Sequence, residues 1–222
     1  MNLSAFDIIG PVMVGPSSSH TAGAARLAGV GRALLGSPPR RAVMRLHGSF
    51  AATGRGHGTD RALVAGLLGD APDAEDLPSS LARAEAAGLE VVFEYIDLGE
   101  QAHPNSVEFE LAREESMLRF TGASLGGGVI EVREVDGLPV CFGCARPTLV
   151  CWHEDRPGFL HEVTGVLAAA AQNIAVLSTA RRSRHAAALT VIETDEPITV
   201  VCREALAAVP GLRLQRYLPA LA

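Results

Sequence analysis

The stretch "TLVCWHEDRPGFLHEVTGVLAAAAQNIAVLSTARR", residues 148–182, decides the fold of the C-terminal part of the chain. It begins with a run typical of a strand, continues with the apolar spacing of a helix whose start is marked by Pro157, and ends in a second strand-like run. The rest of the chain completes the pattern. We expect strands at residues 148–154, 173–182, 186–194 and 211–218, and helices at residues 156–172 and 196–209. This βαββαβ order predicts a ferredoxin-like sandwich, with the helices on one face of an antiparallel sheet.

The N-terminal part of the chain gives a coarser α/β (α+β) pattern. A passage spaced by Gly and Pro, "VDGLPVCFGCARPTL" at residues 135–149, separates it from the ferredoxin-like part. We place the boundary near Ala145, which predicts two domains, residues 1–145 and 146–222. The expected N-terminal helices are residues 21–35, 60–68 and 79–87, and the expected strands are residues 43–47, 90–97, 106–112, 116–122 and 128–134.

Composition excludes several classes of function. The chain has 222 residues, 48% hydrophobic content and a formal net charge of −6. Apolar runs stay shorter than the ~18 residues needed to span a bilayer, so we expect a soluble, cytoplasmic protein with no membrane partner. The negative charge and dispersed arginines argue against a nucleic-acid partner. All 19 basic side chains are Arg, and without lysine the chain can form neither a Schiff base to pyridoxal phosphate (PLP) nor a P-loop.

Four cysteines raise the question of a metal or redox site. Cys141 and Cys144 have C-x-x-C spacing, and Cys151 lies close to His153. A second C-x-x-C or a paired histidine motif is missing, so we expect no metal site on this chain and interpret the segment as a connection between domains. We expect the thiols to stay reduced.

A first polar cluster, "GPSSSHT" at residues 15–21, stands just before an expected helix. Ser or Thr caps satisfy one or two of the free N–H groups at a helix start, and this run contains more polar residues than capping requires. The surplus favours a binding site for an anion such as a carboxylate. A nucleophilic serine is the alternative, but the G-x-S-x-G motif would need a glycine where Ser19 stands.

Two more polar clusters carry histidine, and we place all three in loops. "HGSFAATGRGHGTDRA" begins with His47 and contains His57 among glycines that allow close approach to a ligand. His103, Pro104 and Asn105 form the third cluster. Three such clusters in a chain with seven histidines predict one shared site with acid–base chemistry.

The C-terminal stretch resembles the ACT domain, a small module that binds free amino acids, usually at a dimer interface. The resemblance rests on the turn Asp155–Gly158 and on Asn173 at the start of the second strand. It implies a homodimer and an effector pocket lined by His153, Asp155, Gly158 and Asn173. The free N–H groups at the helix start suit a carboxylate. An ACT fold used only for dimerisation stays open as an alternative.

Over essentially the whole chain, four motifs resemble the beta chain of the bacterial iron–sulfur L-serine dehydratases. They are "FDIIGPVMVGPSSSHTAGAAR", "HGSFAATGRGHGTD", "HPN" and "SLGGGVIEV", which begin at residues 6, 47, 103 and 124. The resemblance implies that the N-terminal part is the domain called ASB. It also implies a PLP-independent reaction that converts L-serine to pyruvate and ammonia, with a [4Fe-4S] cluster held by cysteines of a separate alpha chain.

The same resemblance assigns roles to residues. His20 and His57 are the expected acid and base, and this chain alone is expected to be inactive. The residues expected to bind or orient L-serine are Ser17, Ser19, Thr21, His103 and Asn105. Cys141 and Cys144 fall outside the matched motifs and are not assigned to the cluster. A stand-alone amino-acid sensor without catalysis is the alternative function.

Overall fold

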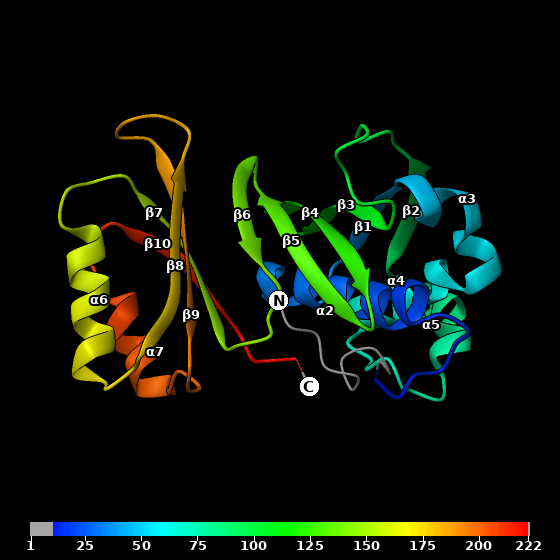
Figure 1. The fold of residues 1–222 in the computed structure, drawn as a ribbon, viewed down its shortest axis with the longest axis horizontal. Helices are drawn as coiled ribbons and strands as arrows, with labels where there is room; N and C mark the ends of the chain where they lie inside the picture. The colour runs from blue at the N-terminus through cyan, green and yellow to red at the C-terminus, as the bar shows by residue number, and fades with distance from the viewer. Residues whose placement is uncertain (1–10, 222) are drawn as a thin grey trace. The chain divides into compact units, whose positions relative to one another are not determined.

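The structure, a computed structural model, describes residues 11–221 and divides into two compact units, one up to Gly137 and one from Leu138 (Figure 1). The division lies in the Gly- and Pro-spaced passage, a few residues before the boundary expected near Ala145. Both units combine helices with a sheet, which confirms the α/β (α+β) fold class. No helix within residues 11–221 has the length and hydropathy required to cross a membrane.

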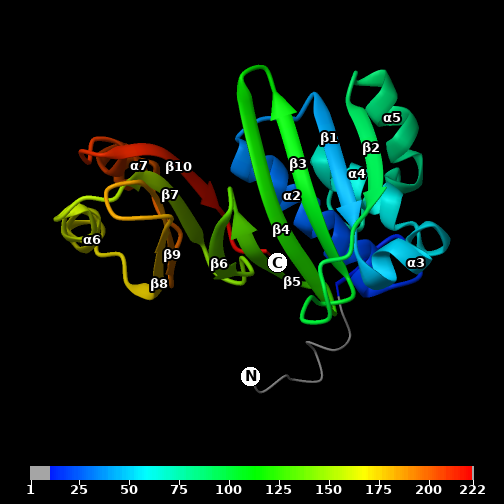
Figure 2. The same ribbon diagram turned by 90° about the horizontal axis from the view of Figure 1, so that it is seen from above.

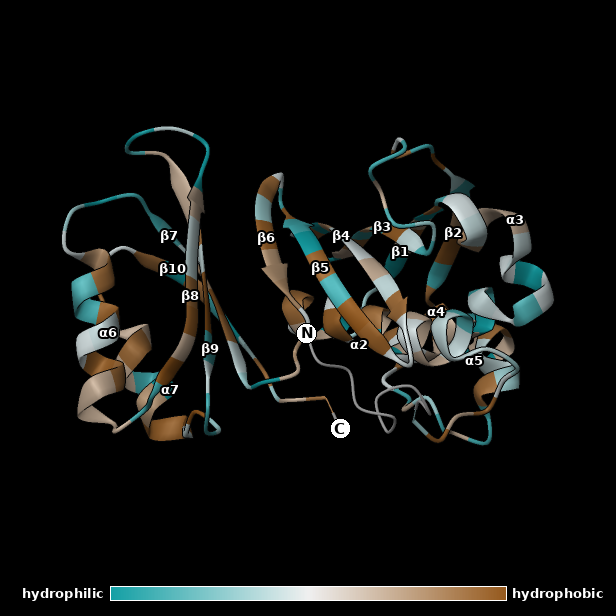
Figure 3. Cartoon of the chain, viewed as in Figure 1, coloured by the Kyte–Doolittle hydropathy of each residue, from teal (hydrophilic) through white to brown (hydrophobic). Residues whose placement is uncertain are grey.

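A six-stranded sheet organises the first unit; its last strand, β6, begins just past the division at Gly137. Its strands lie in the order β2-β1-β3-β4-β5-β6; β1 and β2 are parallel, and the pairs β1–β3, β3–β4 and β4–β5 are antiparallel. β5 carries both hydrophobic and hydrophilic residues (Figure 3), and its buried residues are Ile130, Val132 and Val135, as expected when one face of a strand is buried. The strands are β1 Arg41–Leu46, β2 Glu90–Tyr95, β3 Ser106–Arg113, β4 Ser116–Gly126, β5 Val129–Val135 and β6 Leu138–Phe142.

Helices cover one face of this sheet (Figure 2). They are the π-helix η1 Ser18–Gly23, α2 Ala24–Leu35, α3 Gly48–His57, α4 Thr59–Leu68, the 3₁₀ turn η2 Leu77–Ser79 and α5 Ser80–Ala86. Small residues let them pack closely. A Cβ on Gly66 would lie 2.1 Å from the Ala25 carbonyl oxygen, and one on Gly31 would lie 2.5 Å from the Phe120 ring. Glycine is therefore required where α2 meets α4 and the sheet.

Two elements differ from the sequence-based expectation. Residues 48–57, placed in a loop, form the helix α3. Its glycines lower helix propensity, and tertiary contacts compensate: Phe50 is fully buried, and the N–H groups of Ser49 and Phe50 donate to the Pro104 carbonyl. The connection also contains the strand β6, which includes Pro139 and lies at an edge of the sheet, where a missing N–H is tolerated.

The second unit confirms the βαββαβ prediction. Its sheet has the order β10-β7-β9-β8, antiparallel throughout, with α6 and α7 on one face (Figure 1). Leu149 and Ile192 from the sheet and Val163 and Leu206 from the helices share one buried core. The elements are β7 Thr148–Glu154, α6 Phe159–Ala169, β8 Ile174–Arg181, β9 Ala187–Thr194, α7 Val200–Ala207 and β10 Leu212–Leu218.

Candidate active site

His20 lies in η1, the π-helical turn that precedes α2. Ser17 caps this turn: its Oγ accepts from the His20 N–H at 3.4 Å, and the Thr21 N–H donates to the Ser17 carbonyl. The His20 side chain is 7% exposed. π-Helical turns are rare and often occur at functional sites. Where the sequence predicts the start of a helix, the structure has this π-helical turn, which directs the His20 side chain into the protein.

The helix α3 presents a row of polar side chains to His20. Ser49, Thr53 and His57 are spaced four residues apart and share one face of the helix. His20 Nε2 lies 3.3 Å from Ser49 Oγ and 3.1 Å from Thr53 Oγ1, and its Nδ1 lies 3.3 Å from Ser17 Oγ. The first and second clusters of the sequence thus meet at one imidazole ring.

His57 is the last residue of α3, and its ring lies against that of His20. The ring centroids are 4.7 Å apart with 39° between the planes, and His57 Nδ1 lies 3.0 Å from the Thr53 carbonyl oxygen. Burial, and then the proximity of His57, lower the pKa of His20 below 6.5. His20 is therefore neutral at neutral pH.

The backbone of the third cluster contacts α3, the helix that carries Ser49, Thr53 and His57. The Ser49 N–H donates to the Pro104 carbonyl at 2.7 Å, so the loop of His103 and Asn105 holds the start of α3. Asn105 Nδ2 donates to the Ser124 carbonyl at 3.4 Å. Burial, and then the charge of Arg133, lower the pKa of His103. The three predicted clusters therefore converge in the first unit.

The structure also connects η1 to the "SLGGG" turn of the fourth motif. The Gly127 N–H donates to Ser18 Oγ at 3.3 Å, and the Ser124 hydroxyl packs where a Cβ on Gly23 would lie. Residues 6–10, which open the first motif, lie outside the described residues.

A cavity of about 210 Å³ lies beside His57 and is also lined by Thr21 and Arg61. Thr21 is 1% exposed, and its hydroxyl has no hydrogen-bond partner within residues 11–221. Ser19 is half-buried and its side chain likewise makes no hydrogen bond there. Among these groups, the Arg61 guanidinium lines the cavity from an exposed side chain and is available to a polar ligand.

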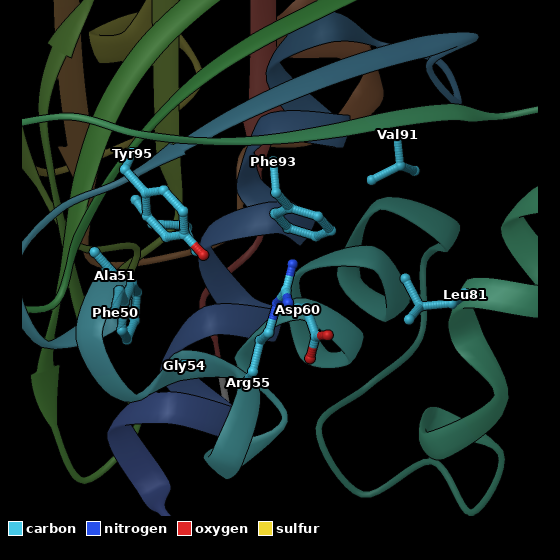
Figure 4. Close-up of a pocket in the computed structure, with 10 residues that line it drawn as sticks. Phe50, Ala51, Gly54, Arg55, Asp60, Leu81, Val91, Phe93 and Tyr95 are labelled. Atoms are coloured by element: carbon cyan, nitrogen blue, oxygen red, sulfur yellow. The ribbon is translucent and has the colours of Figure 1, made fainter.

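A larger hollow of about 330 Å³ lies between α3, α4, α5 and β2 (Figure 4). Phe93 and Tyr95 project into it from β2, and Arg55 and Asp60 lie at its side. Tyr95 is 65% exposed. This surface is mostly apolar and lies on the side of α3 that does not carry the Ser49–Thr53–His57 row.

In the second unit, His153 is a buried part of the core. Its ring stacks on Phe159 with centroids 3.7 Å apart, its Nδ1 lies 2.8 Å from the Glu154 carbonyl and its Nε2 lies 2.8 Å from Thr190 Oγ1. Burial lowers its pKa. Both ring nitrogens have partners, so the ring offers an effector no free hydrogen-bonding atom in this structure.

The other predicted effector residues lie at two ends of the second unit. Asp155 binds Arg181 Nη1 at 2.6 Å and the His185 N–H at 2.9 Å, and exposed Gly158, at φ +86°, precedes α6. Asn173 lies beyond the other end of α6, where its amide donates to Asp195 at 2.6 Å. One copy of the chain therefore does not bring Asn173 together with the other three residues.

The cysteines are poor candidates for a metal centre. Cys144, Cys151 and Cys202 are buried and Cys141 is exposed. Burial raises the pKa of Cys144 and of Cys151 to about 12, so both stay thiols rather than the thiolates that bind metals. Across residues 11–221, no three His, Cys, Asp or Glu side chains are grouped to hold a metal ion.

Sequence reasoning missed Ser49, Thr53 and Arg61. The first two share the face of α3 that carries His57, a relation that a loop interpretation hides. The spacing i, i+4, i+8 that ends at His57 was the available signal.

Comparisons with known proteins agree with this geometry. Residues 4–135 match the family described as "Serine dehydratase beta chain". The chain is 39% identical over 209 residues to the probable L-serine dehydratase, beta chain, of Bacillus subtilis, covering 94% of each protein. It is 35% identical over 215 residues to the L-serine dehydratase, beta chain, of Peptoniphilus asaccharolyticus, covering 96% of this chain and 97% of that protein. An L-serine dehydratase of Mycobacterium tuberculosis is 33% identical over 160 residues, 62% of this chain and 34% of that protein. The chain belongs to the serine dehydratase beta chain family.

Proposed function

We propose that this chain, together with an iron–sulfur alpha chain, converts L-serine to pyruvate and ammonia. The observation that carries the proposal is the pair His20 and His57, in contact with each other where His57 lines a cavity, in a chain whose relatives are named as L-serine dehydratase beta chains. These names do not favour a stand-alone amino-acid sensor. The designation as a beta chain implies a partner alpha chain.

The expected [4Fe-4S] cluster does not fit the cysteines of this chain. Three of the four thiols are buried, and two have a pKa raised to about 12. Iron–sulfur clusters need several thiolates directed at one point. The proposal therefore assigns the cluster ligands to the alpha chain and gives this chain acid–base chemistry and substrate binding.

The reaction removes a proton from Cα of L-serine and the β-hydroxyl as water, and leaves an aminoacrylate that hydrolyses to pyruvate and ammonia. In the proposal, one histidine of the pair accepts the Cα proton and the other protonates the leaving hydroxyl. His57, half-buried at the cavity, is the better placed to reach the substrate. Arg61, which makes no side-chain hydrogen bond or ion pair within residues 11–221, suits the substrate carboxylate.

Hydroxyl and amide groups around the pair would orient the substrate. Thr21, which lines the cavity, has a buried hydroxyl without a partner within residues 11–221, and half-buried Ser19 is proposed to assist it. Ser17 contacts His20 directly. We propose that His103 and Asn105 orient the substrate from the loop that holds the start of α3.

Anaerobic reconstitution tests the proposal. The full chain is combined with its alpha chain, and pyruvate formation from L-serine is followed. We expect turnover by the complex and none by either chain alone. Turnover by this chain alone, or a complex that binds L-serine without forming pyruvate, would contradict the proposed division of roles.

We also propose that the second unit is an ACT domain that forms a homodimer through β8. This strand lies at an edge of its sheet, and Val176 and Leu177 on it are 40% and 37% exposed. An exposed apolar edge strand is a ready template for pairing with a second strand. Sedimentation of Val176→Lys against the unmodified full chain tests this; an unchanged oligomeric state would contradict the β8 interface.

In such a dimer, an amino-acid effector site could draw on both copies. Gly158 and Asn173 lie at opposite ends of α6, so a site that uses both requires residues from two chains. We expect calorimetry of the full chain with L-serine to show a binding event that Asn173→Ala removes and His57→Ala leaves intact. Loss with His57→Ala alone would place the binding in the first unit.

A further inference from the structure

The contacts of the Thr53 hydroxyl bear on which nitrogen of His20 carries the proton. Thr53 Oγ1 donates to the Ser49 carbonyl at 2.9 Å, because a carbonyl oxygen only accepts. A hydroxyl has one hydrogen, so while Thr53 Oγ1 donates to that carbonyl it accepts at its 3.1 Å contact with His20 Nε2. The Ser49 hydroxyl, 3.3 Å from the same nitrogen, is also 3.3 Å from Thr53 Oγ1 and can donate to it. This arrangement favours His20 protonated at Nε2. Nδ1 of the neutral ring is left to accept from the Ser17 hydroxyl, 3.3 Å away.

The backbone of the same residue sets the opposite state in His57. Its Nδ1 lies 3.0 Å from the Thr53 carbonyl oxygen, which requires an N–H donor. Nε2 of the neutral His57 ring then carries a lone pair. The half-buried ring lines the cavity, so this lone pair belongs to the ring that a substrate can reach.

We propose that Thr53 is a positioning residue that fixes the tautomers of both histidines. Its hydroxyl holds His20 as the Nε2–H form, and its carbonyl holds His57 as the Nδ1–H form. The consequence for catalysis rests on the proposed function: His57 has a basic nitrogen ready without prior proton transfer, and the proton of His20 points away from Ser17. The tautomers themselves do not depend on catalysis.

Nitrogen-15 spectra of the histidine rings in the full chain test the tautomers at about pH 8, above the ordinary histidine pKa. His20→Gln and His57→Gln identify the two sets of signals. We expect His20 protonated at Nε2 and His57 protonated at Nδ1. Either ring in the opposite form would overturn the proposal.

Variants of Thr53 test its role. Thr53→Val keeps the shape but removes the hydroxyl, and we expect His20 to become a mixture of tautomers, whereas Thr53→Ser keeps the Nε2–H form. Thr164→Val is the matched control, because the Thr164 hydroxyl also donates to the carbonyl four residues earlier, Leu160, at 2.7 Å in α6. The control should leave both rings unchanged. An unchanged His20 tautomer in Thr53→Val would refute the positioning role.

Turnover of the reconstituted complex separates this inference from the proposed function. We expect Thr53→Val to lower kcat roughly tenfold with KM unchanged, the size of one lost hydrogen bond, and Thr53→Ser to restore it. An unchanged kcat in Thr53→Val would overturn the consequence of the tautomers for catalysis. If His20→Gln and His57→Gln retain full turnover, the acid–base roles proposed for the two histidines fail, while the tautomer assignment stands on its spectra.

Discussion

His20 in the first unit and His153 in the second are alike in several respects. Each is buried, each has a pKa lowered mainly by burial, and each contacts a threonine hydroxyl. Their neighbours differ. His20 lies against a second histidine that lines a cavity, whereas His153 stacks on Phe159 and has partners at both ring nitrogens.

A perturbed pKa therefore does not by itself mark a functional site. Burial lowers the pKa of a histidine equally well in a hydrophobic core and beside a cavity. What distinguishes the first unit is a second ring, His57, whose Nε2 has no partner within the described part of the chain. A free basic nitrogen at a cavity can exchange protons with a ligand, and a saturated one cannot.

The largest effect is expected at the histidine pair. In the reconstituted complex, His57→Ala and His20→Ala should each lower kcat by ~10²–10⁴-fold, the usual contribution of a general acid or base. The free energy of unfolding should change less for His57, which is only half-buried. Steady-state kinetics with L-serine measure the loss.

His161→Ala serves as the control for these two variants, because His161 is exposed on α6 and its side chain makes no hydrogen bond within residues 11–221. Its kcat should equal that of the unmodified complex. If His57→Ala retains more than a tenth of the activity, His57 is not the base. The difference between His20 and His153 is then one of structure and not of function.

The next effect is on stability and belongs to His153. His153→Ala removes the stack on Phe159 and leaves a cavity in the second core, which should lower the free energy of unfolding by about 2–4 kcal/mol. Denaturant unfolding followed by Trp152, the single tryptophan, reports on this unit. The complex should keep its kcat. A loss of turnover without a loss of stability would make His153 functional after all.

The fold of the second unit could be predicted from the sequence because its elements are regular and consecutive. Its helices bury residues four positions apart, Phe159, Val163 and Leu167 in α6 and Cys202 and Leu206 in α7, and the predicted bounds of β7 match those observed. The first unit was harder. α3 contains Gly48, Gly54 and Gly56 and depends on hydrogen bonds to Pro104, more than 40 residues away, which no local pattern announces.

The site could be predicted in part for the same reason. His20 and His57 stand in distinctive motifs, so the sequence marks both as candidate site residues. It does not show that their rings are in contact. Thr53 could not be identified from the sequence, because its role depends on the helix α3, which places it between the two rings. Arg61 was missed, since nothing in the sequence shows that it lacks an ionic partner within residues 11–221.

The smallest effect expected is a dependence of stability on pH. The pKa of His153 in the folded chain lies below the ordinary 6.5. Between these two values the unfolded chain binds more protons than the folded chain, so the free energy of unfolding rises with pH in this window and is level above it. His153 should therefore destabilise the second unit as the pH falls below 6.5.

Glu193 in the same unit acts with the opposite sign. Burial raises the pKa of its carboxyl above 4.5, so its contribution to stability is complete below 4.5 and declines as the pH rises through the raised value. The pH ranges in which His153 and Glu193 titrate can overlap, so a single curve of unfolding free energy against pH would contain both contributions. Subtracting the curve of His153→Gln from that of the unmodified chain, with Trp152 fluorescence as the signal, isolates the histidine. A difference that does not vary between pH 6.5 and acidic pH would mean that His153 titrates as it does in water, and that its burial has no electrostatic consequence.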